Sequence, residues 1–326
     1  MRSKMLMIPL LLTLLANFCY TISAARSQNP VTGTLKITPE KNVFIANATA
    51  PGSRFNVSIT LENINNLFAW QFCLVYNSSL LNFTQLFLPE DHVFAGKSYM
   101  ETPVIAKPGN VSYGITLGPG EEAVNVTTGT LCILEFEILD PSESGVELPA
   151  SDILHFKDSD YTFLLDPVGA VIDCELGESL FAYGYMYTQS HTVTVDENEF
   201  IVVTNSNGEI SPNNVTASKA EKSISFTVTG PSGQFGFVNV TIPKSLLDGN
   251  PSAWAVYVNG NPTSAQITSN ATHTFVYVEF TFGSPTTIKI KGTWIVPEFA
   301  IAWVLLIPLS GAMFTASLIK LIKRKK

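Results

Sequence analysis

The aromatic side chains best placed to bind a ligand form a row near the middle of this 326-residue chain. Phe181, Tyr183, Tyr185 and Tyr187 occupy alternate positions, so a β-strand would present all four rings on one face. Aromatic rings stack on sugars and tyrosine hydroxyls hydrogen-bond to them, which makes Tyr183, Tyr185 and Tyr187 candidate ligand-binding residues. The alternative, which we favour, is that the rings fill a core opposite a face of small residues.

Residues that could carry catalysis or hold a metal are scattered along the chain. Four histidines stand singly, none of them at the spacing of a zinc site: His92, His155, His191 and His273. The run Asp158-Ser159-Asp160 lacks the closing glutamate of a calcium loop. No nucleophile elbow or phosphate-binding loop occurs. We therefore expect no catalytic residue, no metal site and no cofactor, although two glycosidase carboxylates need not be neighbours in sequence.

Asn-x-Ser/Thr triplets predict N-glycosylation of an exported chain. The asparagine must face solvent to accept a glycan, and Asn56 and Asn239 alternate with apolar residues in a way that places them on polar strand faces. The alternative is that exposed strands rich in Asn and Thr produce such triplets by chance. The candidate sites are Asn47, Asn56, Asn77, Asn82, Asn110, Asn125, Asn214, Asn239 and Asn270.

Both ends of the chain carry membrane signals. Basic residues and a short apolar run precede Ala25, which predicts a signal peptide over residues 1–25. An uncharged stretch over 299–319 is long enough to span a bilayer core of about 30 Å, and the basic tail 320–326 stays in the cytoplasm. The alternatives are an uncleaved N-terminal anchor and a buried C-terminal helix. We predict a single-pass protein of the cell membrane with most of the chain outside.

The composition limits which partners the chain can bind and how many disulfides it can form. Charged residues make up 14% of the chain, the net charge is -8, and much of the positive charge lies in the basic tail. An acidic exterior argues against nucleic acid as a partner. Cys73, Cys132 and Cys174 remain after signal cleavage, so at most one disulfide forms within the chain, and its pairing stays open. Alternation with apolar residues predicts that Cys132 is a small core residue.

Period-two alternation predicts an all-β chain. From Arg54 to Glu62, apolar and polar residues alternate strictly, as expected for a strand with one buried face. In the same way we expect Trp70 and Phe72 in the core. Short helical turns are expected near 89–94 or 150–156. The other predicted strands are 68–76, 130–139, 180–187, 191–195, 200–204, 223–229, 235–242, 254–258, 274–282 and 286–290.

A polar cluster at 196–199 predicts a boundary between two domains. We expect one β-sandwich over 31–195 and a smaller, membrane-proximal β-sandwich over 196–292, followed by a stalk over 293–298. Within the smaller domain, Asn259-Gly260 predicts a type I′ hairpin turn, because both positions of that turn need positive φ. About 270 residues outside the membrane provide room for two domains of ordinary size.

Three segments of the first domain resemble cohesin domains. They are 57–64, 67–81 with its Ala69-Trp70-Gln71-Phe72 core, and the run 129–138, Gly-Thr-Leu-Cys-Ile-Leu-Glu-Phe-Glu-Ile. The resemblance covers 31–195 and implies a nine-stranded jelly-roll sandwich, a fold that cohesins share with carbohydrate-binding modules. Ala69 stands where glycine is usual in the family, and Asn77-Ser78 replaces Asp-Pro. No dockerin-binding residues can be carried over.

The C-terminal end is similar to the sorting signals of archaeal surface proteins. Pro297-Glu298-Phe299 directly precedes the apolar stretch, as in substrates of archaeosortases, which implies removal of the helix and attachment to a lipid. An ordinary permanent anchor is the alternative. The second domain resembles membrane-proximal β modules of archaeal surface proteins, through 228–233 and 240–247.

These observations lead to three hypotheses. The first is a non-catalytic binding or adhesion protein of an archaeal cell surface, which recognises a polysaccharide or a protein partner. The second is a structural envelope glycoprotein. The third is a subunit of a polysaccharide-degrading assembly. An exposed tyrosine row would favour the first hypothesis, and a buried row with broad apolar patches the second.

Overall fold

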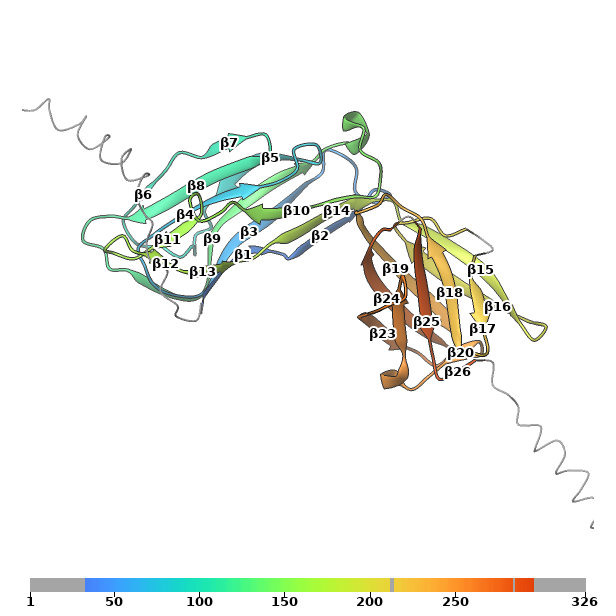
Figure 1. Cartoon of the computed structure of the whole chain (residues 1–326). Helices are drawn as coiled ribbons and strands as arrows, with labels where there is room; N and C mark the ends of the chain where they lie inside the picture. The colour runs from blue at the N-terminus through green and yellow to red at the C-terminus, as the bar shows by residue number, and fades with distance from the viewer. Residues whose placement is uncertain (1–32, 212–213, 284, 296–326) are drawn as a thin grey trace, which may run out of the picture.

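Two β-sandwiches follow one another along the chain (Figure 1). The computed structural model describes residues 33–211, 214–283 and 285–295. The predicted signal peptide (1–25), transmembrane segment (299–319) and basic tail (320–326) lie outside these residues. Within the described ranges, no helix is long and apolar enough to cross a membrane.

The first sandwich consists of two sheets, which we number 1 and 2. Sheet 1 has the order β13 (Cys174–Leu176), β1 (Gly33–Thr38), β3 (Arg54–Leu67), β9 (Val124–Ile138), β5 (Leu81–Phe87). Sheet 2 has the order β12 (Val171–Ile172), β11 (Phe163–Leu165), β4 (Ala69–Val75), β10 (Ala150–Phe156), β14 (Ser179–Gly184), β2 (Lys41–Ile45). Its β4 also pairs with β8 (Asn110–Leu117), which pairs with β6 (Tyr99–Glu101) and β7 (Ile105–Lys107). A short 3-10 helix, η1 (Pro141–Ser144), precedes β10.

The two sheets are joined at one edge by strands that change sheet. β13 pairs in parallel with β1 in sheet 1, and after a break the same run continues as β14, which pairs in parallel with β2 in sheet 2. This arrangement covers strand edges that would otherwise expose unpaired backbone groups. The predicted β-sandwich is confirmed.

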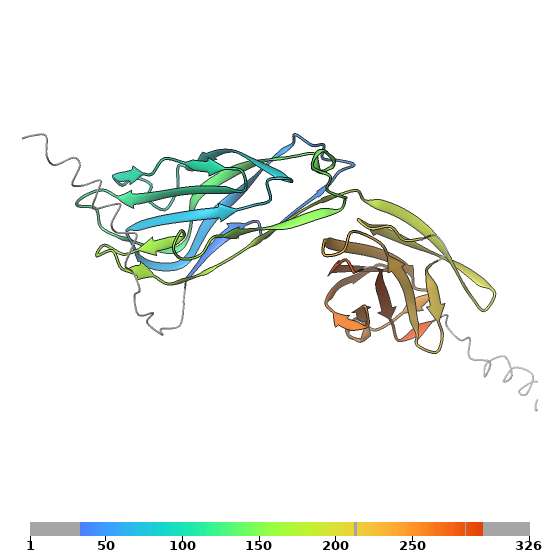
Figure 2. The same ribbon diagram turned by 45° about the horizontal axis from the view of Figure 1, so that its top comes forward.

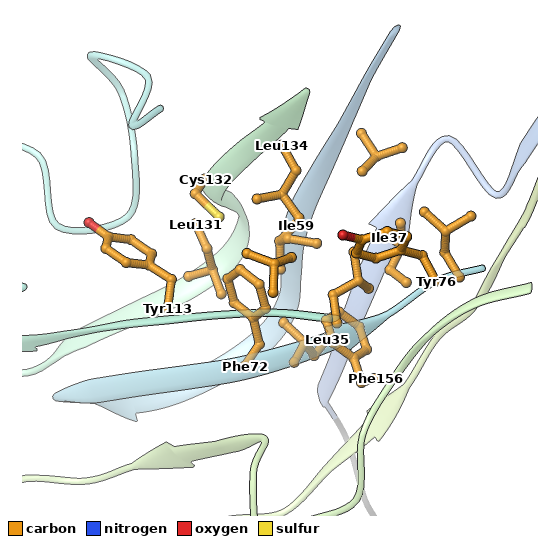
Figure 3. Close-up of a cluster of buried hydrophobic side chains, with 14 of the residues drawn as sticks. Leu35, Ile37, Ile59, Phe72, Tyr76, Tyr113, Leu131, Cys132, Leu134 and Phe156 are labelled. Atoms are coloured by element: carbon orange, nitrogen blue, oxygen red, sulfur yellow. The ribbon is translucent and has the colours of Figure 1, made fainter. Parts of the chain in front are cut away.

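Alternation of apolar and polar residues along the central strands builds most of the first core. Ile59 of β3 and Leu134 of β9 are fully buried, whereas the residues between apolar positions of these strands face out. Figure 3 shows Ile59 and Leu134 near Cys132, Phe72 and Tyr113, from both sheets. Trp70 and Phe72 are 1% and 0% exposed, which confirms that they belong to the core.

The second sandwich consists of two sheets of five strands each. Sheet 3 has the order β15 (Tyr187–Val195), β16 (Asn198–Ser206), β19 (Phe235–Pro243), β24 (His273–Thr281), β23 (Ala265–Ser269). Sheet 4 has the order β17 (Thr216–Ser218), β18 (Ser223–Val228), β25 (Thr286–Lys291), β21 (Ala255–Val258), β22 (Asn261–Thr263). A small pair, β20 (Leu247–Asp248) with β26 (Trp294–Ile295), and a 3-10 helix, η2 (Pro251–Ala253), complete it.

Local turn chemistry was predicted well in this domain. Asn259 and Gly260 have φ angles of 50° and 83°, and they join β21 to β22 as a two-residue turn. The alternation in β24 also holds, with Val276 and Val278 fully buried in the second core.

The structure corrects three boundaries. Residues 150–156, one of two segments considered for a short helical turn, form strand β10, because they pair with β14 and β4. The predicted strand 180–187 is two strands, β14 and the start of β15. The predicted stalk 293–298 begins inside the second sandwich, where Ile295 is buried and pairs with Leu247.

The predicted domain boundary at 196 also moves. β15 and β16 form a nine-pair hairpin whose turn is Asp196-Glu197, so the change of sandwich occurs between Gly184 and Tyr187. Both turn residues have positive φ, 48° and 65°. A polar cluster that suggests a linker is thus a tight turn that lacks the usual glycine.

We expect Glu197→Gly to stabilise the second sandwich. A non-glycine residue in the left-handed region costs about 1–2 kcal/mol, and glycine removes most of that cost, so the gain should be about 1 kcal/mol. Urea unfolding of the full chain measures it. The control is Glu199→Gly inside β16, which should destabilise by about 0.5–1 kcal/mol. Equal effects of the two variants would contradict the turn assignment.

Candidate functional site

The outer face of sheet 1 is polar. Lys36 pairs with Glu62 at 2.7 Å, and Arg54 pairs with Glu135 at 3.0 Å, each pair across neighbouring strands. Two exposed triplet asparagines, Asn56 and Asn82, lie on the same face, opposite Glu135 and Glu137. A sheet face covered by ion pairs and amides is a well-solvated surface.

The outer face of sheet 2 has no charged residue at its centre. Outward positions of β4 and β8 lie opposite one another as the pairs Ala69–Thr116, Gln71–Gly114, Cys73–Ser112 and Val75–Asn110. Strand positions on an exposed face usually carry charged and polar residues. Eight uncharged, mostly small residues therefore form a strip that is inexpensive to desolvate, and two of them, Cys73 and Gly114, are already buried.

Apolar side chains border this central strip: Met100, Ile105 and Val171 are exposed, and Phe163 and Leu165 are half-buried. By register, Met100 and Ile105 lie beyond β8, whereas Phe163, Leu165 and Val171 lie beyond β4. Met100 and Ile105 are 57% and 54% exposed. We name the strip and these five residues the uncharged face. At one end it is bounded by Lys107 and His155, which pair with Asn110 and Val75.

The loop between β10 and β11 fixes one margin of the uncharged face. The side-chain amide of Gln71 donates to the backbone carbonyl of Tyr161 (3.2 Å). The backbone amide of Cys73 donates to the side-chain hydroxyl of Thr162 (3.2 Å). The Lys157 ammonium lies 3.4 Å from the centre of the Tyr161 ring. The face is thus held in shape without a partner, which favours binding with little reorganisation.

A shallow groove of about 420 Å³ lies at one end of the first sandwich. It runs between β5 and the β7–β8 turn, and the Tyr76 hydroxyl at its base donates to the Lys107 carbonyl (3.3 Å). Its lining residues are Tyr76, Ser78, Leu81, Asn82, Phe83, Ala106, Lys107, Pro108 and Leu139. No pattern in the sequence predicted this groove.

The two sandwiches meet through polar contacts that the sequence did not reveal. The Ser151 amide of β10 donates to the Gln234 side chain, and the Phe235 amide donates to the Ser151 hydroxyl (2.7 Å). Lys41 of β2 forms an ion pair with Glu279 of β24. Figure 2 shows the end of the first sandwich reaching the second at this junction.

The predicted aromatic row does not form one face. Phe181 and Tyr183 are buried in the first core, where the Tyr183 hydroxyl donates to the Thr49 carbonyl (2.8 Å). Tyr185 and Tyr187 are 47% and 43% exposed, but Tyr185 lies in the connection and Tyr187 begins β15. The row therefore spans two domains and offers no continuous stacking surface.

The carboxylates of Asp158 and Asp166, in and after the run that was compared with a calcium loop, accept hydrogen bonds within local turns. Asp158 accepts the Asp160 amide (3.3 Å), and Asp166 accepts the amides of Val168 (2.9 Å) and Ala170 (2.8 Å). No group of three or more metal-ligating side chains occurs within residues 33–211, 214–283 and 285–295.

Among the described residues, Cys73, Cys132 and Cys174 are free thiols. Cys132 is fully buried in the first core, as predicted, and burial raises its pKa well above the usual range. Burial also raises the pKa of Cys174 to about 11. The thiolate, which is the reactive form, is therefore disfavoured at both positions.

His92 gives the first sandwich a pH-dependent stability. Burial lowers the pKa of His92 below 6.5, against the opposing effect of Glu101 and Asp91. A lowered folded-state pKa provides stabilisation above the unfolded value that is lost as the pH falls through the folded value. Acidification from about pH 7.5 to about pH 5 should lower the melting temperature of this sandwich in the wild type, and we expect a smaller decrease in His92→Gln. The control is His155→Gln, and an equal acid response in wild type and His92→Gln would contradict the assignment.

The predicted glycosylation asparagines occupy different environments. Those that the structure leaves exposed are Asn47, Asn56, Asn82, Asn125 and Asn270. Those that are half-buried are Asn77, Asn110, Asn214 and Asn239. The side-chain oxygen of Asn239 is buried and lacks a hydrogen-bond partner among the described residues.

No protein-family model and no curated protein matches the chain. Solved structures with a similar fold are cohesin domains. A cohesin from Clostridium acetobutylicum is 16% identical with a TM-score of 0.36, over 47% of this chain and 91% of that one. A non-cellulosomal cohesin from the archaeon Archaeoglobus fulgidus is 14% identical with a TM-score of 0.34, over 46% and 90%. A Clostridium thermocellum cohesin, solved in a type I cohesin–dockerin complex, is 18% identical with a TM-score of 0.35, over 47% and 99%.

Proposed function

We propose that this chain is a non-catalytic binding protein that takes a protein partner on the uncharged face of its first sandwich. The observation that carries the proposal is the contrast between the two outer faces of that sandwich. Sheet 1 presents ion pairs and sheet 2 presents an uncharged strip with exposed Met100 and Ile105. Protein interfaces have apolar centres depleted of charge, whereas a face with no partner is normally charged.

The position of the chain in the cell is part of the same proposal. A signal peptide over 1–25 and an anchor over 299–319, retained or cleaved by an archaeosortase, would hold both sandwiches outside the membrane. Glycans on the exposed asparagines of sheet 1, Asn56 and Asn82, would leave the uncharged face open, whereas the triplet asparagine Asn110 lies within that face and must stay unmodified for docking. The Clostridium thermocellum cohesin was solved in complex with a dockerin, and a protein partner for this chain is in keeping with that complex.

A pair of matched arginine substitutions tests the docking face. Thr116 on β8 and Thr60 on β3 are both half-buried, outward-facing residues of central strands, and neither belongs to a glycosylation triplet. Cross-linking of the wild-type chain to surface proteins of the native cells first identifies a partner. The affinity of the chain for that partner is then measured with purified components. We expect Thr116→Arg to weaken that affinity by more than about tenfold, because it buries an unpaired charge, and Thr60→Arg to leave it unchanged.

The result that would overturn the proposal is a partner lost with Thr60→Arg and retained with Thr116→Arg. Melting curves of both variants establish that the first sandwich is folded. Failure of the wild-type chain to bind any protein at its native surface would also reject the docking function.

A further inference from the structure

The outermost strand of sheet 3, β15, presents a regular row of unpaired backbone groups. β15 pairs with β16 over nine residues without a register shift, and Val195 and Asn198 close the two-residue turn between the strands. The pair that closes such a turn is hydrogen-bonded, and along an antiparallel pair of strands bonded and non-bonded pairs alternate. The residues of β15 whose N–H and C=O groups point away from β16 are therefore Thr188, Ser190, Thr192 and Thr194. We name these four residues the free edge.

Nothing in the described part of the chain covers the free edge. All four residues are exposed, and within 33–211, 214–283 and 285–295 their backbone groups make no further hydrogen bond. The loop after β16 meets this strand at Gln189, whose side-chain oxygen accepts the Ile210 amide (3.2 Å), and leaves the four residues exposed. Figures 1 and 2 both show the β15–β16 hairpin pointing away from the first sandwich. A further strand can therefore reach β15 from outside.

The free edge lacks the features that protect the other outer strands from strand addition. Sheets protect an exposed edge with charged residues, proline, a bulge or a very short strand. Among the described strands, β13 carries Glu175, β2 carries Lys41 and β22 carries Pro262. β5 has a register shift after Phe83, β23 has five residues, and β6, β7, β12, β17, β20 and β26 have two or three. β15 has nine residues and none of these features.

The composition of β15 suits pairing with an identical strand. Its sequence, Tyr-Thr-Gln-Ser-His-Thr-Val-Thr-Val, contains no Asp, Glu, Lys or Arg and is rich in the β-branched residues that favour strands. Two copies of a charged strand bring like charges opposite one another, which opposes self-pairing. This strand has no such charges, and no asparagine that a glycan could occupy. A second copy of the same strand is therefore a partner that the edge admits.

One antiparallel register uses the whole free edge. With a two-fold axis at His191, Ser190 lies opposite Thr192 of the second copy and Thr188 lies opposite Thr194 of the second copy. Every outward N–H and C=O then meets a partner, whereas a shift by two residues in either direction brings the turn or the interdomain connection into the pairing. The side chains on the outer face form Thr–Thr and Thr–Ser pairs, which stabilise neighbouring strands.

We propose that a second copy of this chain pairs with the free edge, so that the two copies of sheet 3 form one continuous sheet. Such an interface is isologous and occupies both free edges, which limits the assembly to a dimer. The proposal concerns the second sandwich and does not depend on the uncharged face of the first.

Sedimentation equilibrium of the full-length chain in detergent, over a series of concentrations, tests the proposal. We expect the wild type to dimerise and Thr192→Lys to weaken dimerisation by at least tenfold, because the two lysines would lie about 7–8 Å apart on neighbouring strands. The matched control is Thr268→Lys, an exposed position on β23 at the opposite edge of the same sheet, which should dimerise as the wild type does. Melting curves establish that the variants are folded.

A disulfide between two copies tests the register. Chains with Ser190→Cys and chains with Thr192→Cys, carrying different tags, are mixed and oxidised. Opposite residues of a hydrogen-bonded pair have Cα atoms about 5.5 Å apart, which a disulfide can bridge. We expect a mixed disulfide from this combination and none from Ser190→Cys with Thr268→Cys. The wild type, oxidised in the same way, controls for the native thiols.

A wild-type chain that is monomeric at every concentration would overturn the proposal. A dimer that Thr192→Lys leaves intact would do so too, because the copies would then associate elsewhere, through the uncharged face or the predicted membrane segment. Absence of the mixed disulfide would reject the register and the strand pairing with it. A dimer that is weakened only by Thr192→Lys, together with the mixed disulfide, would establish the interface.

Discussion

Replacing Phe136 by alanine should lower the free energy of unfolding of the first sandwich by about 3–5 kcal/mol. Phe136 is fully buried in β9, and its ring is the centre of an aromatic cluster. The ring centres of Tyr76, Phe55 and Phe83 lie 5.1, 6.0 and 6.0 Å from it. Alanine leaves a cavity that rigid strands from both sides cannot close, so the transfer and cavity terms add.

Calorimetry of the full chain can measure this loss separately for each domain. The two sandwiches have distinct hydrophobic cores, and each core contains residues of one sandwich only. The transition of the first sandwich should therefore move to a lower melting temperature in Phe136→Ala, whereas the transition of the second sandwich should change little. The control is Ile133→Ala, three residues away on the outward face of the same strand, which should cost much less. A large shift of both transitions would show that the cores unfold as one unit.

The second large effect is expected at a ring held between two glycines. An added Cβ at Gly208 would lie 2.7 Å from the Phe282 ring, and one at Gly230 would lie 2.6 Å from it. The bridge between Glu209 and Thr229 holds the two glycine segments together around the ring. Phe282 is only 2% exposed, so it cannot move outward without exposing the second core. Gly208→Val should destabilise the second sandwich by about 1–3 kcal/mol through overpacking.

A double-mutant cycle identifies the cause of that loss. If the clash with the ring is responsible, Phe282→Leu should recover part of the stability in the Gly208→Val background, although it destabilises the wild type. Urea unfolding of the four chains gives the coupling energy. Additive effects of the two substitutions would mean that Gly208 is needed for another reason.

Much of the secondary structure follows from the sequence because strand faces are a local property. Alternation alone predicted that Ile59, Leu134 and Val278 face a core, and the structure confirms each of them. The turn at Asn259-Gly260 was predictable for the same reason, since its φ requirement concerns two adjacent residues.

Errors arose where a local pattern has two tertiary outcomes. Residues 180–187 alternate aromatic and small side chains throughout, but the chain leaves one sandwich and enters the next within this run. Tyr183 thus faces a core, whereas Tyr187 is exposed at the start of a hairpin in the other domain. The Asp196-Glu197 turn looked like a linker because polarity marks both kinds of segment.

The sequence by itself determined that this chain is built from β-strands, which side of most strands is buried, and which residues could accept glycans. Only the tertiary structure decided which strands share a sheet, and with them the uncharged face. The absence of charge from alternate positions of 69–75 and 110–117 is visible in sequence, but its meaning depends on β4 lying beside β8. Alternation is fixed by the geometry of a single strand, whereas pairing depends on contacts between residues far apart in the chain.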